Sequence, residues 1–347
     1  MMKYKNLLIT GGAGFIGSNL AVHLRSKYPK LKVVVLDNLV RKGSELNLPR
    51  LKDSRVKFIR GDIRNPKDLA LGNDIDLMIE CSAEPSILAG YQNPKYVIDV
   101  NLVGTVNCLE FCRKRKADII FLSTSRVYPY GEVNEIERRE LATRFNWLGF
   151  EGISERFPIS GPKTLYGATK LASEMLIQEY INDFGIRGVI NRCGVVAGPW
   201  QFGKVDQGIF TYWMHAHYFK RPLKYIGFGG KGKQVRDILH IDDLFNLINL
   251  EINSLSKING SIYNVGGGRF ASLSLLETTK FCEEITGNRL KIGSDLKNRP
   301  GDIAIYISDN TKISHDVGWK PRKKAKETLI DIYNWIKNNE AQLKNLA

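Results

Sequence analysis

Tyr166 and Lys170 stand four residues apart in a segment, residues 165–176, whose other side chains favour helix. If the segment is helical, the phenol and the ammonium lie on one face of it. A neighbouring ammonium lowers the pKa of a phenol from about 10 toward the range in which a general base works near neutral pH. The spacing therefore predicts proton transfer, although it also occurs by chance on surface helices.

A glycine-rich turn near the start of the chain gives this pair its context. The turn, TGGAGFIG, lies between an apolar run at residues 6–10, predicted as a strand, and a predicted helix at 18–27. Gly11 allows the tight turn, Gly14 lets the backbone approach a pyrophosphate, and Gly17 lets the helix pack closely. The helix N-terminus adds free N–H groups and a positive dipole end. We expect a bound dinucleotide here, the alternative being glycines that serve only the turn.

The next predicted strand, residues 31–36, ends in Asp37. A carboxylate at this place accepts hydrogen bonds from the adenosine ribose and repels a 2′-phosphate, which favours NAD over NADP. Arg41 and Lys42 weaken that inference, because cations can hold a phosphate. After a third predicted strand, Asp62 is placed either to contact the adenine or to cap the following turn.

Apolar strands alternate with helical stretches up to about residue 195, which predicts an α/β fold with a Rossmann-type doubly wound parallel sheet. We expect an NAD-binding domain over residues 1–195. A polar, aromatic-bearing insertion at 130–162 interrupts it and is expected to form a flap beside the active site. Residues 196–347 are expected to form mainly a smaller C-terminal α/β lobe that binds the substrate, with one helix, 237–255, returning to the first domain.

The composition sets wider limits. A chain of 347 residues with 43% hydrophobic content can bury a large core, and without a signal pattern or a long apolar run it is expected to be cytoplasmic, with no membrane partner. The five cysteines lack paired spacing, which argues against a metal site or a disulfide framework. The net charge of +15 suits nucleic acid, but the basic residues are scattered and no reader motif accompanies them. We therefore expect no nucleic-acid partner and a basic field that attracts an anionic nucleotide.

The motifs of this chain resemble, in order, those of the extended short-chain dehydrogenase/reductase superfamily, over almost the whole sequence. They are the glycine turn, Asp37 with Asn38, residues 61–63, 101–105 and 123–128, and Tyr166 with Lys170. Within the superfamily, a further set of segments resembles the CDP-paratose 2-epimerase family, whose members are also called CDP-tyvelose epimerases. These segments are residues 37–43, 61–65, 232–240, 263–267 and 272–277.

Reactions in the superfamily differ at the residues that follow Thr124. Dehydratases carry Asp-Glu there and UDP-glucuronate decarboxylases carry a glutamate in place of Arg126, whereas this chain has Ser125 and Arg126. The resemblance therefore leaves epimerisation, reduction or dehydrogenation. It implies an NAD-dependent epimerase that inverts a nucleotide-linked sugar through a transient ketose, at C2 of a CDP-sugar that serves surface-polysaccharide synthesis. A 4-epimerase or 4-reductase stays open, as does a non-catalytic NAD-sensing or RNA-binding member of the fold.

The resemblance also implies residue roles. Tyr166 is the base, Lys170 lowers its pKa and binds the nicotinamide ribose, and Thr124 aligns the sugar oxygen. Cofactor contacts are implied for Gly11, Gly14, Phe15, Ile16, Gly17, Asp37, Asn38, Asp62, Ile63, Ser82, Ala83, Asn101, Ser123, Tyr166 and Lys170. Substrate contacts are implied for Glu84, Ser125, Arg126, Asn191, Gln207, Arg236, Arg299 and Asp302.

Several of these roles have alternatives. Ser123 and Ser125 can replace Thr124, Glu84 can be structural, and Arg236 or Arg299 can form a surface ion pair. The resemblance finally implies a homodimer, held together by the helices expected at residues 101–113 and 166–183, and no metal.

Overall fold

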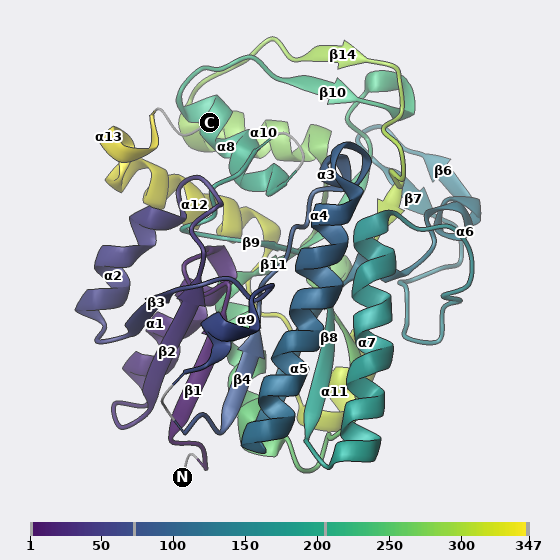
Figure 1. The fold of residues 1–347 in the computed structure, drawn as a ribbon. Coiled ribbons are helices and arrows are strands. Elements are labelled where there is room, and N and C mark those ends of the chain that lie inside the picture. Colours follow the sequence, from purple (N-terminus) through teal and green to yellow (C-terminus); the bar gives the residue numbers. More distant parts are fainter. Residues whose placement is uncertain (1–2, 72–73, 205–206, 345–347) are drawn as a thin grey trace.

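The computed structural model describes residues 3–71, 74–204 and 207–344. Its centre is a seven-stranded, all-parallel sheet with the order β3-β2-β1-β4-β5-β8-β12 (Figure 1). The strands are β1 (Asn6–Thr10), β2 (Lys32–Asp37), β3 (Lys57–Arg60), β4 (Leu77–Glu80), β5 (Asp118–Thr124), β8 (Gly188–Cys193) and β12 (Ile262–Val265). From β1 the chain first adds strands on one side, β2 and β3, and then on the other side, beginning with β4. The strand order thus reverses between β1 and β4, and a ligand crevice is expected outside the carboxyl ends of these two strands. The predicted Rossmann-type fold is confirmed.

Helices cover both faces of this sheet. One layer consists of α5 (Gly104–Arg115) and α7 (Leu165–Phe184), which lie side by side in Figure 1, and the other of α1 (Phe15–Lys27), α9 (Ile241–Ser254) and α11 (Thr311–Val317). Leu109 and Ile177 bury the first layer against the strands, and Leu20 and Leu247 bury the second. Burial of these apolar side chains holds the strand ends in fixed positions.

Short helical segments lie along the chain between β2 and β3 and between β4 and α5. They are α2 (Leu48–Asp53), α3 (Ile87–Gln92), α4 (Pro94–Ile98) and a π-helical turn (Asp99–Val103) that leads into α5. In the part of the chain that the structure describes, no helix is both long and apolar enough to cross a membrane.

A smaller lobe is built around a second sheet and four helices. Its strands are β9 (Val195–Ala197), β11 (Val235–His240), β13 (Ser272–Ser274) and β15 (Ile305–Tyr306), with β10 (Lys224–Ile226) and β14 (Gly293–Asp295) as a separate pair. Its helices are α8 (Ile209–Tyr218), α10 (Leu275–Thr286), α12 (Ala325–Asn338) and the short α13 (Glu340–Leu343). Phe210, Trp213 and Leu329 are among the residues that form its core.

Two segments depart from the sequence-based expectation. Residues 237–240 are predicted as helix but form the end of strand β11, which pairs with β9 and β13. The helix begins only at Ile241. The His240 side chain caps it by accepting a hydrogen bond from the N–H of Asp242. Strand β12 comes from the part of the chain expected in the smaller lobe, yet it pairs with β8 at the edge of the main sheet. Four residues are too few to reveal which sheet a strand joins.

The insertion at 130–162 packs against the smaller lobe, and its role as a flap beside the active site stays a prediction. It contains α6 (Tyr130–Glu135) and the strands β6 (Arg138–Glu140) and β7 (Phe145–Trp147). Val133, Trp147 and Ile153 pack into one cluster with β15 of the smaller lobe. Its aromatic side chains thus act as core, because their burial removes apolar surface from water.

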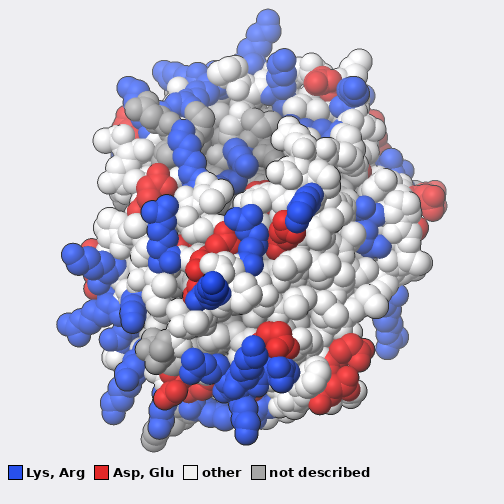
Figure 2. Space-filling view, viewed as in Figure 1, with Lys and Arg blue, Asp and Glu red and all other residues white. Residues whose placement is uncertain are grey.

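The charges agree with the sequence-based reading. Figure 2 shows Lys and Arg side chains distributed over this face with Asp and Glu among them, without one continuous basic stripe.

Candidate active site

The predicted base lies on the first turn of α7, opposite the end of β5. Thr164 caps this helix by accepting a hydrogen bond from the N–H of Gly167 at 3.3 Å. The Tyr166 hydroxyl is hydrogen-bonded to Thr124, the last residue of β5. Gly167 permits this approach, because a Cβ there would lie 2.0 Å from the backbone oxygen of Arg126. The structure therefore brings the predicted base and the predicted oxygen-aligning threonine together.

Lys170 stands one helical turn further on and is 1% exposed. Its Nζ lies 3.6 Å from a carboxylate oxygen of Glu80 and 4.1 Å from the centroid of the Phe121 ring. No described residue forms a hydrogen bond with this Nζ. A buried ammonium that keeps its donors free is suited to a polar ligand such as a ribose.

The pKa of Tyr166 is raised in the structure, whereas the sequence predicts that it is lowered. Burial raises the pKa of Tyr166 to about 12, although the hydrogen bond with Thr124 and the charge of Arg126 oppose the rise. The carboxylate of Glu80 raises it further. The sequence predicts that Lys170 lowers this pKa. Burial is the largest influence on it and raises it, the Lys170 ammonium pairs with Glu80, and the effect of Lys170 on Tyr166 stays a prediction.

The glycine turn at the end of β1 has the close contacts that its glycines predict. Gly11 has a φ of +63°, and a Cβ on it would meet the Cys81 oxygen and the Ser82 nitrogen at 2.9 Å. A Cβ on Gly17 would lie 2.4 Å from the Gly11 oxygen. Gly14 is the N-cap of α1 and supplies no side-chain cap, so the helix start is open to an anion. The turn therefore fits a pyrophosphate.

Asp37 lies at the end of β2 and is held by backbone groups. Its carboxylate accepts hydrogen bonds from the N–H of Ala13 at 3.0 Å and of Leu39 at 2.8 Å. Burial raises the pKa of Asp37, and these N–H groups oppose the rise. Arg41, which could have held a 2′-phosphate, binds the amide oxygen of Gln207. This arrangement fits NAD better than NADP.

Asp62 caps the turn that follows it, which is the alternative to adenine contact considered above. Its carboxylate accepts hydrogen bonds from the N–H of Arg64 at 2.9 Å and from the Asn38 amide at 2.8 Å, and it pairs with the Arg64 guanidinium at 2.7 Å. Although burial alone would raise it, these contacts lower the pKa of Asp62 to about 2. The carboxylate thus orders its own turn, and contact of Asp62 and Asn38 with adenine stays a prediction.

The remaining cofactor candidates divide into two groups. Partly exposed residues at the carboxyl edge of the sheet are Phe15 and Ile16 in the first turn of α1, and Ser82 and Ala83 after β4. Ile63 is buried, and a Cβ on Gly104 would lie 2.5 Å from its side chain, so this isoleucine packs against α5.

Two predicted ligand contacts face the wrong way, which corrects their assignment. The Ser123 hydroxyl donates a hydrogen bond to Glu174 in the middle of α7, whereas Thr124, the next strand residue, meets Tyr166 at the start of that helix. Asn191 is fully buried, and its amide donates to Glu251 of α9 at 2.9 Å. Both residues contribute to the packing of helices on the sheet.

Asn101 and Glu84 connect the loop after β4 to its surroundings. Asn101 is fully buried; it accepts a hydrogen bond from the Glu84 N–H at 2.8 Å and donates to Thr169 at 3.3 Å, so it fastens this loop to α7 instead of presenting its amide to a cofactor. The Glu84 carboxylate accepts hydrogen bonds from the Ser86 N–H at 3.0 Å and from the Gln207 amide at 3.2 Å. Glu84 and Gln207 thus bridge the loop and the smaller lobe.

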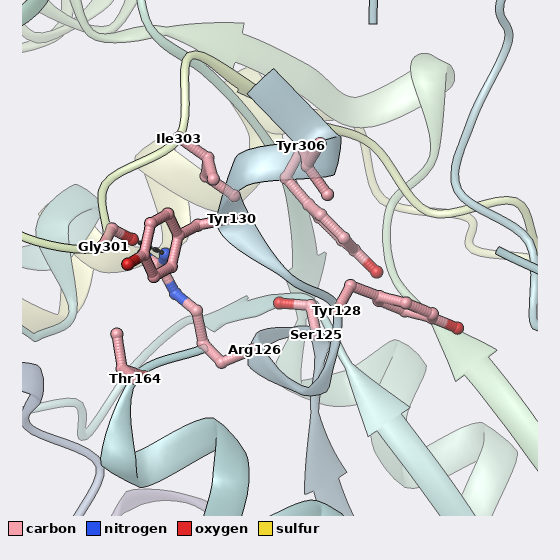
Figure 3. A pocket seen from close by; sticks show the side chains of 9 residues that line it. Ser125, Arg126, Tyr128, Tyr130, Thr164, Gly301, Ile303 and Tyr306 are labelled. Carbon is pink, nitrogen blue, oxygen red and sulfur yellow. Dashed lines mark hydrogen bonds between the residues drawn. The ribbon is translucent and has the colours of Figure 1, made fainter. Parts of the chain in front are cut away.

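A cavity adjoins the end of β5 (Figure 3). Its lining residues are Ser125, Arg126, Tyr128, Tyr130, Val133, Thr164, Gly301, Ile303 and Tyr306. The Arg126 guanidinium donates a hydrogen bond to the Gly301 oxygen at 2.9 Å, drawn as a dashed line in Figure 3. Of the predicted substrate residues, Ser125 and Arg126 therefore line one cavity, formed by the main domain, the insertion and the segment before β15.

Arg236 and Asp302 form an ion pair beside this cavity. The guanidinium donates to the carboxylate at 2.9 Å and to the Ile303 oxygen at 2.7 Å. Burial lowers the pKa of Arg236 to about 10, and the Asp302 charge opposes that fall. The alternative considered for Arg236 is an ion pair at the surface, whereas the pair that is present is largely buried. Arg299 lies partly buried in the same segment, and its oxygen accepts the Asp302 N–H at 3.2 Å.

Sequence reasoning missed two buried carboxylates. Glu80 closes the apolar strand β4, and a carboxylate that ends a buried strand is itself a signal. Glu174 lies four residues beyond Lys170, on the same helix face, and pairs with Arg192 of β8 at 2.7 Å. Arg192 also donates to the Tyr128 hydroxyl at 3.1 Å, so this pair supports one wall of the cavity.

Comparisons with known proteins agree with this geometry. A family model described as "NAD dependent epimerase/dehydratase family" matches residues 7–266. The CDP-paratose 2-epimerase of Salmonella typhi is 33% identical, over 95% of this chain and 98% of that protein. Two solved structures are the Bacillus cereus UDP-glucuronic acid 4-epimerase with UDP-glucuronic acid and NAD (TM-score 0.79, 28% identity) and the Thermus thermophilus UDP-glucose 4-epimerase with NAD (TM-score 0.77, 26% identity). Each alignment covers 96% of this chain and 99% of the other.

These findings confirm the cofactor prediction. The glycine turn accommodates a pyrophosphate, Asp37 stands at the end of β2, and the two solved relatives contain NAD. The cofactor is NAD.

Proposed function

Because the chain belongs to the NAD dependent epimerase/dehydratase family, we propose that it inverts one carbon of a nucleotide-linked sugar through a transient keto intermediate. The proposed reaction is of the CDP-paratose 2-epimerase type, at C2 of a CDP-linked 3,6-dideoxyhexose, in the synthesis of surface-polysaccharide precursors. The relative that is 33% identical over nearly the full length of both chains supports this choice.

The observation that carries the proposal is the chemistry of Ser125 and Arg126, the residues that follow Thr124, together with the other side chains of the small cavity that these two residues line. None of the described residues that line it is Asp or Glu, and Arg126 directs a guanidinium into it. Loss of water from a sugar needs a general acid near the leaving hydroxyl, a part for which Asp or Glu is well suited. A guanidinium cannot take that part, because it stays protonated. Proton transfer by Tyr166 without elimination is the chemistry that these groups support.

The proposed mechanism assigns one task to each residue. NAD, when bound, supplies a hydride acceptor that later returns the hydride to the same carbon. Tyr166 takes the proton of the sugar hydroxyl and gives it back to the same oxygen, and Thr124 holds that oxygen in line. Lys170 uses its free donors for the nicotinamide ribose. The keto sugar must turn its other face to the cofactor between the two steps, so that the hydride returns with inverted configuration.

Nucleotide recognition is proposed for the arginines of the smaller-lobe side. Guanidinium groups bind phosphate oxygens through paired donors. Arg236 stands beside the cavity with Asp302 as its present partner, and Arg299 lies in the adjoining segment. A pyrophosphate that approaches here would share Arg236 with Asp302.

A product screen tests the proposal. Purified protein is incubated with CDP-, UDP-, GDP- and dTDP-linked sugars, and the configuration of each product is followed by NMR. We expect inversion at C2 of a CDP-linked 3,6-dideoxyhexose. Inversion at C4 of a UDP-sugar, net reduction, or loss of water would contradict the assignment.

We also propose a cytoplasmic homodimer. Val103, Met175 and Phe184, on or beside α5 and α7, are 43%, 61% and 52% exposed, and these helices lie side by side on the outside of the sheet. Pairing of the two helices with those of a second copy would cover such apolar surface in a four-helix bundle. Light scattering should give twice the chain mass of 39.2 kDa at micromolar concentration, and a mass of one chain would contradict the dimer.

A further inference from the structure

A buried polar cluster lies at the carboxyl ends of β1 and β4, next to the proposed base. Thr10 and Glu80 are register partners on these strands, and both are 0% exposed. Lys170 reaches Glu80 from α7, with 3.6 Å between its Nζ and the nearer carboxylate oxygen. Within the described residues, the Thr10 hydroxyl and the Lys170 Nζ have no partner at ordinary hydrogen-bond distance. Burial raises the pKa of Glu80, and the Lys170 charge and the Ser82 N–H oppose that rise.

Glu80 decides where the ammonium of Lys170 lies. A buried charge is stable only beside an opposite charge or hydrogen-bond partners. In the part of the chain that the structure describes, Glu80 is the carboxylate that pairs with this lysine, and the other close neighbour is the face of Phe121 at 4.1 Å. Without the Glu80 carboxylate, the Phe121 ring would be the main group that attracts the ammonium. A cation–π contact is weaker than a buried ion pair.

The pair also determines the field at Tyr166. Besides its bond with Thr124, this tyrosine faces titratable or charged groups from three elements. They are Glu80 at the end of β4, Arg126 after β5 and Cys193 at the end of β8. Lys170, one turn further along the same helix, is the partner of Glu80. Burial raises the pKa of Tyr166, and Cys193 and Glu80 add to the rise, against Thr124 and Arg126. Because Lys170 and Glu80 together are nearly neutral, the ammonium acts on the phenol as part of a dipole and not as a free positive charge.

We propose that Glu80 is a positioning residue of the active site: its carboxylate holds the Lys170 ammonium at the end of β4 and limits the positive charge that acts on Tyr166. This inference rests on the proposed function, in which Tyr166 is the base and Lys170 holds the cofactor ribose. Glu80 touches neither sugar nor cofactor in this role, and it acts through Lys170.

The pH profile of turnover tests the proposal. Glu80→Gln keeps the shape of the side chain and removes its charge, so the charge of Lys170 should reach Tyr166 undiminished. The rise of kcat with pH, which reports deprotonation of Tyr166, should then move to lower pH by about one unit. The matched control is Glu251→Gln, the same change at another fully buried carboxylate, whose partner is Asn191. Its profile should coincide with that of the wild type.

A second readout does not depend on turnover. Tyrosine labelled with carbon-13 at Cζ reports ionisation by NMR, and the signal of Tyr166 is assigned by its loss in Tyr166→Phe. At about pH 11 the wild-type signal should stay close to that of a phenol, whereas in Glu80→Gln it should lie about halfway toward that of tyrosinate. If the wild type acts on no nucleotide sugar, the proposed function fails, and this titration still decides the role of Glu80. An unchanged Tyr166 titration in Glu80→Gln would overturn the inference.

A charge-conserving variant shows whether Glu80 acts by placing Lys170 or only by carrying a negative charge. Glu80→Asp keeps the negative charge but withdraws it by one methylene. Its Tyr166 titration should stay close to that of the wild type, while kcat falls because Lys170 is displaced. If Glu80→Gln does not fold, Glu80→Asp still decides: a kcat equal to that of the wild type would refute positioning, and a lowered kcat with an unmoved titration would support it.

Discussion

Replacement of Gly167 by alanine should separate the proposed base from its partner. A Cβ on Gly167 would lie 2.0 Å from the Arg126 oxygen, whereas real Cβ atoms essentially never come closer than 3.0 Å. The first turn of α7 or the Arg126 backbone would therefore have to retreat by about 1 Å. Tyr166 is the residue just before Gly167, and Thr124 lies two residues before Arg126. Either movement opens the hydrogen bond between Tyr166 and Thr124.

The effect on catalysis should exceed the effect on stability. A misplacement of about 1 Å costs on the order of 10²-fold in rate, which corresponds to about 3 kcal/mol of barrier. Overpacking destabilises by about 1–3 kcal/mol, but alanine in place of glycine inside a helix regains up to about 1 kcal/mol. We therefore expect the Gly167→Ala variant to lose about 10²-fold in kcat and only about 0–2 kcal/mol in unfolding free energy.

The assay compares kcat, NAD content and urea unfolding in Gly167→Ala and in a matched variant. Gly131 in α6 offers the control, because a Cβ there would meet nothing within 4 Å, so Gly131→Ala should keep wild-type kcat. NAD content should stay the same in both variants, since the glycine turn of β1 is untouched. A Gly167→Ala variant with full kcat would refute the reasoning that close helix packing aligns Tyr166.

Three further predictions concern the base, the cofactor and a buried acid. Tyr166→Phe should lose on the order of 10² to 10⁴ in turnover with little change in nucleotide affinity, whereas Tyr91→Phe, at a side chain that is 60% exposed, should lose nothing; an active Tyr166→Phe would remove the proposed base. Denatured protein should release NAD or NADH in near-stoichiometric amount, and release of NADP would contradict the role of Asp37. Burial raises the pKa of Glu251 from 4.5 to about 8, so its protonated form stabilises the fold fully below pH 4.5, and this contribution is lost as the pH rises toward 8. Glu251→Gln should therefore raise the midpoint of thermal unfolding more at pH 8 than at pH 5, and an equal effect at both would show that the folded carboxyl is not protonated.

Contacts within short stretches of chain could be predicted from the sequence. The glycine turn follows from three glycines between a strand and a helix, and the shared face of Tyr166 and Lys170 follows from helical spacing. The parallel sheet follows from the alternation of strands and helices. In each case the residues that determine the geometry are neighbours in the chain.

Contacts between distant segments could not be predicted in this way. The pairs Lys170–Glu80 and Asn191–Glu251 join a helix and a strand that meet only in the folded chain. Strand alternation shows that Ser123 and Thr124 point in different directions, but not which of them meets Glu174 and which meets Tyr166. The insertion looks like a polar loop, because its buried partner surface, β15, lies far along the chain. These features depend on packing, which a single sequence does not display.

Isotope labelling tests the central claim most directly, namely that inversion proceeds by removal and return of a hydride, with Tyr166 moving only the hydroxyl proton. Hydride held on a nicotinamide does not exchange with water, so epimerisation in D2O should leave no carbon-bound deuterium at the inverted carbon. Substrate with deuterium at that carbon should keep its label in the product. Entry of solvent deuterium at the inverted carbon, or loss of the label to water, would indicate a carbanion and contradict the account.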